Sequence, residues 1–580
     1  MGSTDGKNAQ DRGAEHPKLA RLAALVVDLS AIAGMLVLLT GGLRLRHVPY
    51  IGKLSITFYG PFFLPLAICL AWGLRPAGSR TVPWVVRAAA AFDALSARKQ
   101  QLWLLITIAL GLLAHGLIVL LKYYSFQSAM DLAIYANACH GALFSTMKGD
   151  VWLFADHFEP LLLLFTPLCR SFSPAISLLV VQTIGWGVGA FGIFVLARHQ
   201  RYRPCIAWLC TALYLNLSGN VTIAYYDFHL LSLALALIPW LWWAVAAERY
   251  GALVLLVLVY LGLKESAALS LIGLGAFLAL DSNLRNVRNA KRRYLGLAFV
   301  AVGAVTFVVI ITVVYPAFRD GEGTMYFAKY YGHLGKSLPE VVQTAFTRPV
   351  YFAYQLLKPR KLVYLFRLFA PFLFFPLRYP RYLLPVLPAI LVNILSNQPS
   401  MYSAGYHYEA EIFPALFAMA VIAFSGRTRL QSIWLACVLV AFTSASPLAV
   451  ARLSLPTPPQ RRLAKLLAEH VPQDRAIAAP QRVAAHLTDR ARLYMFDYWQ
   501  MEDDWKRADI VVVGFHGRTL GWYPWQMLES QKLPKMLPGL RLLYQDAEDP
   551  RFRVFEVLPS AAQLPSIAHP LATPQHPNGK

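Results

Sequence analysis

Residues 101–121 read QLWLLITIALGLLAHGLIVLL and contain no Asp, Glu, Lys or Arg. A helix of this length rises roughly 30 Å, which matches the thickness of the hydrocarbon core of a bilayer. Basic residues stand on both sides of the run, at Arg98, Lys99 and Lys122. The segment therefore predicts a membrane-spanning helix.

Similar apolar runs recur along the chain, and several are shorter than the usual length of roughly 17 to 25 residues. We expect about thirteen crossings in all, within about two. The runs at 251–263 and 266–280 could instead form one broken helix. The apolar runs lie at about 20–41, 57–74, 101–121, 174–197, 204–224, 229–247, 251–263, 266–280, 295–315, 361–377, 382–395, 412–425 and 430–450.

The composition agrees with an α-helical polytopic membrane protein. Of the 580 residues, 57% are hydrophobic and 15% are charged, whereas a soluble domain carries roughly 25% charged residues. This excludes a soluble globular enzyme, a disordered chain and a small disulfide-stapled module. The 6 Cys form no CxxC or other metal-ligand spacing, and we interpret them as small apolar packing residues.

The distribution of Lys and Arg predicts the orientation of the chain. Residues 1–17 are polar, and the apolar run that follows, from Leu19 to about Thr40, is long enough to span a bilayer. We therefore expect a retained helix and a cytoplasmic N-terminus. If the sides then alternate, almost every cytoplasmic connection is basic, which obeys the positive-inside rule and explains much of the net charge of +23. These connections are 75–100, 198–203, 248–249, 281–294, 378–381 and 426–429.

The same topology divides the chain into four regions. A cytoplasmic N-terminus and two additional transmembrane helices occupy residues 1–100, and the transmembrane core occupies 101–450, with external loops at 122–173 and 316–360. Short strand-like runs between helical patterns predict a small external α/β domain at 451–558. Residues 559–580 are rich in Pro, Ala and His, which predicts a disordered tail. The strand-like runs lie at 476–478, 492–496, 509–513, 540–544 and 553–557.

Acidic and His side chains collect on the predicted external side. Carboxylates near the membrane are costly unless they are paired, bind a cation or have a function. Each cluster alone could be a helix cap, a hydrated loop or a self-neutralising pair, so their shared side is the stronger argument. The clusters are Asp131; Asp156, His157 and Glu159; Asp227 and His229; Lys264 and Glu265; and His407, Glu409 and Glu411.

The second external loop, 316–360, is aromatic and basic. Tyr330, Tyr331, Lys336 and Arg348 stand in it, with Lys361 directly after it. One interpretation is an interfacial belt of Tyr with snorkelling cations. The other is a surface that holds the phosphate of a lipid carrier while aromatic rings line a sugar or isoprenoid site.

The order of these motifs resembles a known family. The resemblance covers about residues 101 to 558, and the two spans before residue 100 look like an addition. The family is a widespread group of prokaryotic polytopic membrane proteins of unknown function that is grouped with the GT-C superfamily of membrane glycosyltransferases. The motifs are Asp131, His140-Gly141, His157 to Pro160, Pro167, Gln182, Asp227 to His229, Lys264-Glu265, Arg348-Pro349, the run Pro380 to Pro388, and Tyr406 to Pro414.

The resemblance implies a GT-C-like fold with an active site on the external face. Its relatives take a sugar from a polyprenyl-phosphate carrier and use an acidic residue in the first external loop, which Asp131 matches by position. The second acidic element falls on Asp156 or Glu159. Because Asp-His-Phe-Glu is neither Asp-x-Asp nor Glu-x-Asp, the need for a divalent cation such as Mg²⁺ or Mn²⁺ stays open.

The residues fit an inverting transfer, in which one base takes the proton of the acceptor hydroxyl and positive charge stabilises the leaving phosphate. We assign Asp131 as the general base. The acceptor would be an envelope glycan, lipid or protein at the bacterial cytoplasmic (inner) membrane, with the C-terminal domain in the periplasm. The supporting or cation and phosphate groups are Asp156, His157, Glu159, Asp227 and His229, and the phosphate or substrate ligands are Lys264, Glu265, Arg348, His407 and Glu409.

Two other function classes compete with this prediction. A secondary transporter or a flippase of an envelope precursor would place charges near the bilayer midplane of repeated halves, whereas the sequence has charges at one edge and no repeat. A non-catalytic membrane scaffold or sensor would use the outer domain to bind a partner. Nucleic acid is not an expected partner, and the sugar, the acceptor and the oligomeric state do not follow from the sequence.

Overall fold

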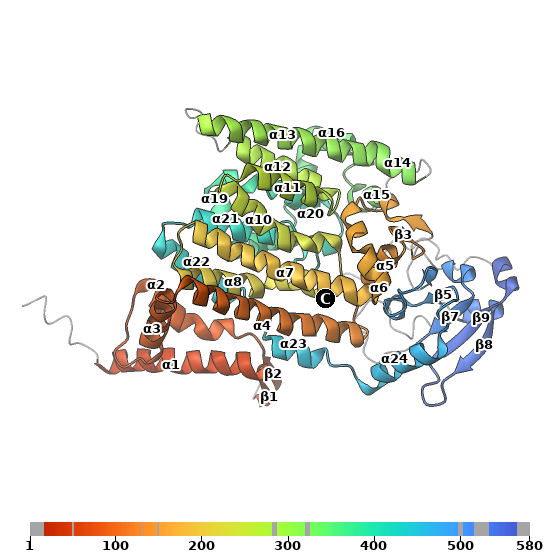
Figure 1. The fold of residues 1–580 in the computed structure, drawn as a ribbon, viewed down its shortest axis with the longest axis horizontal. Coiled ribbons are helices and arrows are strands. Elements are labelled where there is room, and N and C mark those ends of the chain that lie inside the picture. Colours follow the sequence, from red (N-terminus) through yellow and green to blue (C-terminus); the bar gives the residue numbers. More distant parts are fainter. Residues whose placement is uncertain are drawn as a thin grey trace, which may run out of the picture.

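The computed structural model describes residues 17–48, 52–128, 130–147, 150–280, 287–319, 325–496, 503–514 and 533–564. Most of these residues are helical, and a five-stranded sheet lies near the C-terminal end of the chain. Figure 1 shows the helices stacked side by side in one body, with the sheet at one end of it. The predicted cytoplasmic residues 1–16 and the tail beyond residue 564 lie outside the described residues.

Four helical stretches are long and apolar enough to cross a membrane, and they coincide with four of the predicted runs. They are α1 (Pro17–Thr40), α4 (Ala97–Tyr124), α7 (Pro174–His199) and α13 (Val287–Val309), which continues through a π turn, Ile310–Val314, into α14 (Tyr315–Phe318). Leu110 and Leu113 of α4 are 62% and 68% exposed. Such bare leucines suit a helix face that meets lipid.

Shorter apolar helices fill the rest of the helical body. Several predicted runs are interrupted, because 204–224 breaks at the extended Leu217 and 361–377 breaks after Phe369. The run pair at 251–263 and 266–280 forms two helices, and the total of about thirteen crossings stays a prediction. These elements are α2 (Leu64–Trp72), α8 (Pro204–Asn216), α9 (Ser218–Tyr225), α10 (Ala234–Ala246), α11 (Tyr250–Leu261), α12 (Ser266–Leu280), α18 (Pro359–Phe369), α19 (Phe375–Arg378), α20 (Leu387–Leu395), α21 (Phe413–Ala423) and α22 (Thr428–Ala441).

Small connecting elements join these helices. They comprise α3 (Thr81–Asp93), α5 (Met130–His140), α6 (Thr166–Ser171), α15 (Met325–Tyr331), α16 (Leu338–Thr347), α17 (Pro349–Leu356), α23 (Pro447–Leu453), the hairpin β1 (Leu43–Val48) and β2 (Gly52–Ile56), and the strand pair β3 (Phe144–Ser145) and β4 (Val151–Trp152). Single 3₁₀ turns lie at Gly60–Phe63, Leu153–Ala155, Pro160–Phe165, Leu230–Leu233, Ala370–Phe372, Pro380–Leu383, Pro399–Tyr402, Asp504–Arg507, Leu537–Gly539 and Pro559–Gln563.

The centre of the helical body is close-packed. Helices α7 and α10 approach so closely that a Cβ atom on Gly189 would lie 1.8 Å from the carbonyl oxygen of Leu235. Only glycine permits this contact. Trp186 and Trp434 are almost completely buried in the same core.

The C-terminal region contains a mixed sheet in the order β6-β5-β7-β9-β8. β5 pairs in parallel with β6 and β7, whereas β9 pairs antiparallel with β7 and β8. Alternate residues face two separate cores, as the period of a strand requires. The small sheet expected from the sequence is thus confirmed. Its elements are α24 (Pro458–His470), β5 (Ile477–Ala479), α25 (Gln481–Ala484), β6 (Leu493–Met495), β7 (Ile510–Val513), α27 (Leu533–Met536), β8 (Leu540–Gln545) and β9 (Arg553–Val557).

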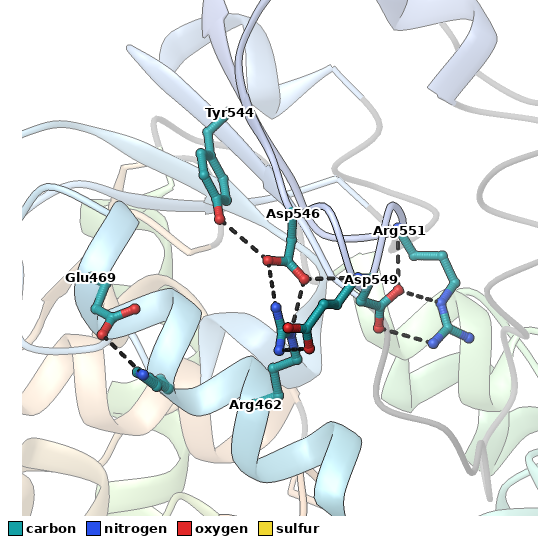
Figure 2. Close-up of polar contacts among 8 residues, drawn as sticks. Arg462, Glu469, Tyr544, Asp546, Asp549 and Arg551 are labelled. Atoms are coloured by element: carbon teal, nitrogen blue, oxygen red, sulfur yellow. Dashed lines mark hydrogen bonds and ion pairs between the residues drawn. The ribbon is translucent and has the colours of Figure 1, made fainter.

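A network of charged side chains fixes α24 to the turn between β8 and β9 (Figure 2). The guanidinium of Arg462 donates to both oxygens of Asp546, at 2.9 and 2.8 Å. The backbone N–H of Asp549 also donates to Asp546, at 2.7 Å, and the hydroxyl of Tyr544 does so at 3.3 Å. A fork-to-fork pair of this kind is among the stronger ionic contacts in proteins.

Candidate functional site

Asp131 lies in the first turn of α5, next to two aromatic side chains from the segment that follows α9. The hydroxyl of Tyr226 donates to Oδ2 of Asp131 at 3.2 Å. The Nε2 atom of His229 lies 3.7 Å from the same oxygen. The Asp131 side chain is 24% exposed, whereas that of His229 is 6% exposed. The carboxylate is therefore contacted by Tyr226 and His229 and remains partly exposed.

Helix α5 is buried on nearly all sides, which is unusual for a helix in a predicted loop. Its sequence, MDLAIYANACH, is rich in small residues, and Leu132, Ala133, Ala136 and Ala138 are fully buried. Tyr135 and Cys139 pack into the helical core, whereas Ala133 and Ile134 pack against the C-terminal region. Small side chains let other elements approach the helix closely. The backbone that carries Asp131 is thus held from two sides.

The segment after α5 is bonded to the edge strand of the C-terminal sheet. The hydroxyl of Thr146 donates to the carbonyl of Leu493 at 2.7 Å and accepts from the N–H of Leu493 at 2.8 Å. Asn137 donates from its amide to the carbonyl of Arg490 at 3.1 Å. Thr146 therefore satisfies the free edge of β6, which would otherwise expose backbone groups. Figure 1 shows α5 and α6 beside this sheet.

A disulfide bond joins Cys139 of α5 to Cys169 of α6. Our interpretation of all six cysteines as packing residues is wrong for these two, because the separation of 30 residues carries no recognisable spacing. Cys69, Cys205, Cys210 and Cys437 are free. Disulfides persist in oxidising compartments outside the cytosol, which agrees with the expected external position of loop 122–173.

The second group of ionisable residues centres on His157. Its Nδ1 atom lies 3.0 Å from Oε1 of Glu265, and its Nε2 atom lies 3.8 Å from Oδ2 of Asp156. The N–H of Phe158 donates to Oε2 of Glu265 at 3.2 Å. Since Glu265 stands at the break between α11 and α12, the break brings a carboxylate to the first predicted external loop.

Glu159 and Glu265 differ sharply in acidity. Glu159 is fully buried, and burial raises its pKa to about 7, although Lys264 and His157 oppose this. Burial also acts to raise the pKa of Glu265, but His157 and Lys264 outweigh it and hold that pKa at about 2. A neutral and an ionised carboxyl group can thus coexist here near pH 7, the arrangement that separates acid from base roles in enzymes.

Tyr135 links this group to Asp131. It lies one helical turn after Asp131 on α5, and its hydroxyl donates to Oε1 of Glu159 at 2.8 Å. Its ring centre lies 5.2 Å from that of His229. The charges of Glu159, Asp131 and Asp156 all act on this phenol. Tyr135 was not among the predicted site residues, although its spacing of four residues from Asp131 was a usable signal.

The segment before α21 completes the cluster. The ring of His407 stacks on that of His229, with centroids 3.4 Å apart and planes inclined by 19°. His407 and Glu409 are buried. Burial lowers the pKa of His407 well below its usual value, and His229 and Lys264 add to this effect. Burial raises the pKa of Glu409 to about 8. Both side chains are therefore neutral near pH 7.

Glu411 and Lys264 face each other across the same region. The hydroxyl of Tyr260, on α11, donates to Oε1 of Glu411. Burial raises the pKa of Glu411, whereas Lys264 acts to lower it. Lys264 also acts on Glu159 and Glu265. Its positive charge thus lies among three carboxyl groups.

The two remaining predicted site residues are Asp227 and Arg348. The side chain of Asp227 interacts electrostatically with Lys122 of α4, and its backbone carbonyl lies 3.1 Å from Nδ1 of His229. Arg348 is exposed at the junction of α16 and α17. The structure therefore gathers most of the predicted residues, with Arg348 as the clear exception.

The suggested cation ligands, Asp156 and Glu159, contact His157 and Tyr135. Within the described parts of the chain, no group of three or more His, Cys, Asp or Glu side chains is arranged to hold a metal ion. The question of a divalent cation stays open.

A family model described as "Predicted membrane protein (DUF2079)" matches residues 122–529, well over half of the chain. No curated protein matches. Solved structures that resemble the chain include the Archaeoglobus fulgidus oligosaccharyltransferase in complex with Zn and sulfate, at 13% identity and a TM-score of 0.35. This match covers 67% of this chain and 62% of that chain, so the protein spans less than two thirds of that relative.

The same archaeal enzyme tethered to an acceptor peptide matches at 12% identity and a TM-score of 0.37, covering 80% of this chain and 74% of that one. The enzyme in complex with an inhibitory peptide and a dolichol-phosphate matches at 12% identity and a TM-score of 0.35. That match covers 68% of this chain and 65% of the other.

Proposed function

The chain belongs to the DUF2079 family of predicted membrane proteins, and we propose that it is an inverting membrane glycosyltransferase. The donor would be a sugar on a polyprenyl-phosphate carrier, as the family resemblance implies. The acceptor would be an envelope glycan, lipid or protein on the external face of the bacterial inner membrane. One observation carries the proposal: the partly exposed carboxylate of Asp131 is contacted by Tyr226 and His229 beside a cluster of further carboxyl groups.

In the proposed reaction, Asp131 accepts the proton of the acceptor hydroxyl while that oxygen attacks the anomeric carbon. A new carbon–oxygen bond forms as the bond to the phosphate oxygen breaks, and the departing polyprenyl phosphate takes the electron pair. A single displacement inverts the anomeric centre. A general base must lie within hydrogen-bond reach of the hydroxyl, and the side chain of Asp131 is 24% exposed, more than those of Asp156 and Glu265. Tyr226 and His229 would hold its orientation.

The surrounding groups would tune the electrostatics of this step. Tyr135 donates a hydrogen bond to Glu159, and His157 pairs with Glu265 beside it. Such preorganised charge needs no rearrangement when charge develops in the transition state. Asp156, Asp227, His407 and Glu409 are proposed as supporting groups, and the outer domain is proposed to position the acceptor.

One observation favours a second candidate, a secondary transporter or flippase. Transporters often place ionisable groups at breaks in membrane helices. The break between α11 and α12 carries Lys264 and Glu265, and buried Glu411 lies within electrostatic reach. The test of the proposed function therefore has to separate covalent transfer from transport.

The test uses the full chain reconstituted in vesicles with a radiolabelled polyprenyl-phosphate sugar. Asp131→Asn should reduce covalent transfer by at least about 10²-fold without lowering the unfolding temperature. Glu469→Gln, which removes an exposed carboxylate in α24, is the matched control and should transfer normally. Wild-type transfer by Asp131→Asn would remove the assignment, and movement of labelled lipid across the vesicle without covalent transfer would favour the transporter. Mass analysis of envelope glycans in a deletion strain would identify the acceptor.

A further inference from the structure

Lys361 is a buried cation without a polar partner. It lies in the first turn of α18 and is 1% exposed. Its Nζ atom has no hydrogen-bond partner among the described residues, and the ring of Tyr402 is 5.1 Å away. A buried ammonium group is costly unless it is paired. A native structure that keeps one needs an explanation, such as a ligand that supplies the missing charge.

Further polar groups converge on the same place. Lys358, at the N-cap of α18, acts electrostatically on Lys361, and both lysines act on His333. Neither ring nitrogen of His333 has a hydrogen-bond partner in the described part of the chain. Burial and both lysines lower the pKa of His333 to about 4, so at pH 7 the ring is neutral and can donate one N–H.

No carboxylate among the described residues forms an ion pair with Lys361, Lys358 or His333. Lys264 differs in this respect, because its charge acts on Glu159, Glu265 and Glu411. The N-terminus of α18 adds partial positive charge near Lys358 and Lys361. An anion is therefore the ligand that these groups lack.

Lys361 is connected to the candidate site through Tyr364. Tyr364, one turn after Lys361 on α18, accepts a hydrogen bond from the Asn393 amide at 2.8 Å and interacts with Glu409. Glu409 is two residues from His407, which stacks on His229 beside Asp131. The residues before α21 therefore connect the surroundings of Lys361 to the carboxylate cluster.

The exposed surface of α16 to α18 carries several large apolar side chains. On α16 to α18, Phe346 and Val350 are 82% and 83% exposed, and Leu357, Leu362 and Phe366 are exposed as well. Exposed apolar side chains of this extent mark a surface that meets a membrane or an apolar ligand. A cluster of cationic and neutral donor groups beside such a surface suits an anion that is attached to a hydrocarbon chain.

We propose that Lys361, with Lys358 and His333, binds the phosphate group of a membrane lipid whose hydrocarbon chain lies along the exposed face of α16 to α18. The inference rests on the proposed function in one respect: the lipid would be the carrier of the sugar. It replaces Arg348, which is exposed, and Lys264, whose charge acts on Glu159, Glu265 and Glu411, as the expected phosphate ligands. Ammonium groups and a neutral imidazole N–H are good donors to phosphate oxygens.

The experiment measures binding of undecaprenyl phosphate to the full chain in nanodiscs of phosphatidylcholine, by native mass spectrometry. Lys361→Met should weaken binding by about 10-fold or more, as expected for loss of a charge-assisted bond. Lys361→Arg should retain most of the affinity. Lys336→Gln, an exposed lysine before α16, is the matched control and should bind normally. Because Lys361→Met removes a buried charge without a partner, it should unfold at or above the wild-type temperature.

Three results would overturn the inference: equal affinity of Lys361→Met and wild type, equal affinity for neutral undecaprenol, or displacement of the lipid by inorganic phosphate at millimolar concentration. The last result would indicate a site for free phosphate. Asp131→Asn should bind undecaprenyl phosphate normally while it loses transfer. If binding depends on Lys361 but the protein has no transferase activity, the proposed function is refuted and the proposed lipid-binding role of Lys361 is supported.

Discussion

Replacing Thr146 by valine tests how firmly the C-terminal sheet fixes the helix that carries Asp131. The hydroxyl of Thr146 makes two hydrogen bonds to the backbone of Leu493, at 2.7 and 2.8 Å, and both residues are buried. Valine keeps the shape of the side chain and removes both bonds. Each buried backbone group left without a partner costs about 1–3 kcal/mol. The expected loss in the free energy of unfolding is therefore about 2–6 kcal/mol.

The assay is denaturant unfolding of the full chain in detergent, followed by limited proteolysis in the linker before α24. Thr146→Ser is the matched control, because serine keeps the hydroxyl and loses one methyl group, worth about 0.8 kcal/mol. We expect valine to lower the unfolding midpoint clearly more than serine does, and to expose the linker to protease. Equal midpoints for the two variants would show that the bonds to β6 do not hold α5, and the argument about its position would fail.

Three further predictions follow from other contacts. Burial raises the pKa of Glu159 from 4.5 to about 7. The stability that this group contributes is therefore present below about pH 4.5 and is lost as pH rises through about 7. Glu159→Gln should flatten that part of the profile of unfolding temperature against pH. Replacing Cys139 and Cys169 by serine should cost about 3–4 kcal/mol, given a separation of 30 residues, and alkylation of the wild-type protein with and without reductant should show two additional reactive thiols after reduction. Asp546→Asn should lower the free energy of unfolding by about 1–3 kcal/mol. Because Arg462 holds the pKa of Asp546 at about 2 against the effect of burial, the stability from this pair should be lost only as pH falls from about 4 to about 2. Glu469→Gln, on an exposed pair, should leave the unfolding temperature unchanged.

The elements that the sequence predicted best are those with a strong local pattern. The uncharged run at 101–121 lies inside α4, and the β-branched run at 509–513 contains β7. The sequence also predicted an interruption at Lys264 and Glu265, and α11 ends before these residues while α12 begins after them. In these cases the pattern itself determines the element, because apolar length and β-branching act within a single segment.

Pairings between distant segments could not be predicted in the same way. The sequence placed Asp131, Glu159 and Glu265 on one side of the membrane, but it did not indicate that His157 bonds Glu265 or that His229 stacks on His407. Sidedness restricts a residue to a plane, whereas a hydrogen bond requires a position within a few tenths of an ångström. The disulfide of Cys139 escaped prediction for the same reason.

Lys264 and Lys361 show how charge balance separates structural from binding groups. Lys264 lies among Glu159, Glu265 and Glu411, and its charge acts on all three carboxyl groups. Its removal would leave the ionised Glu265 with less compensation, which is destabilising. Lys361 has no such dependants among the described residues, and its own charge is the one without compensation. The charge of Lys264 is compensated by carboxyl groups of the fold, whereas the charge of Lys361 has no such compensation among the described residues. An anionic ligand can supply it, and for this reason Lys361 is the better candidate for binding the phosphate.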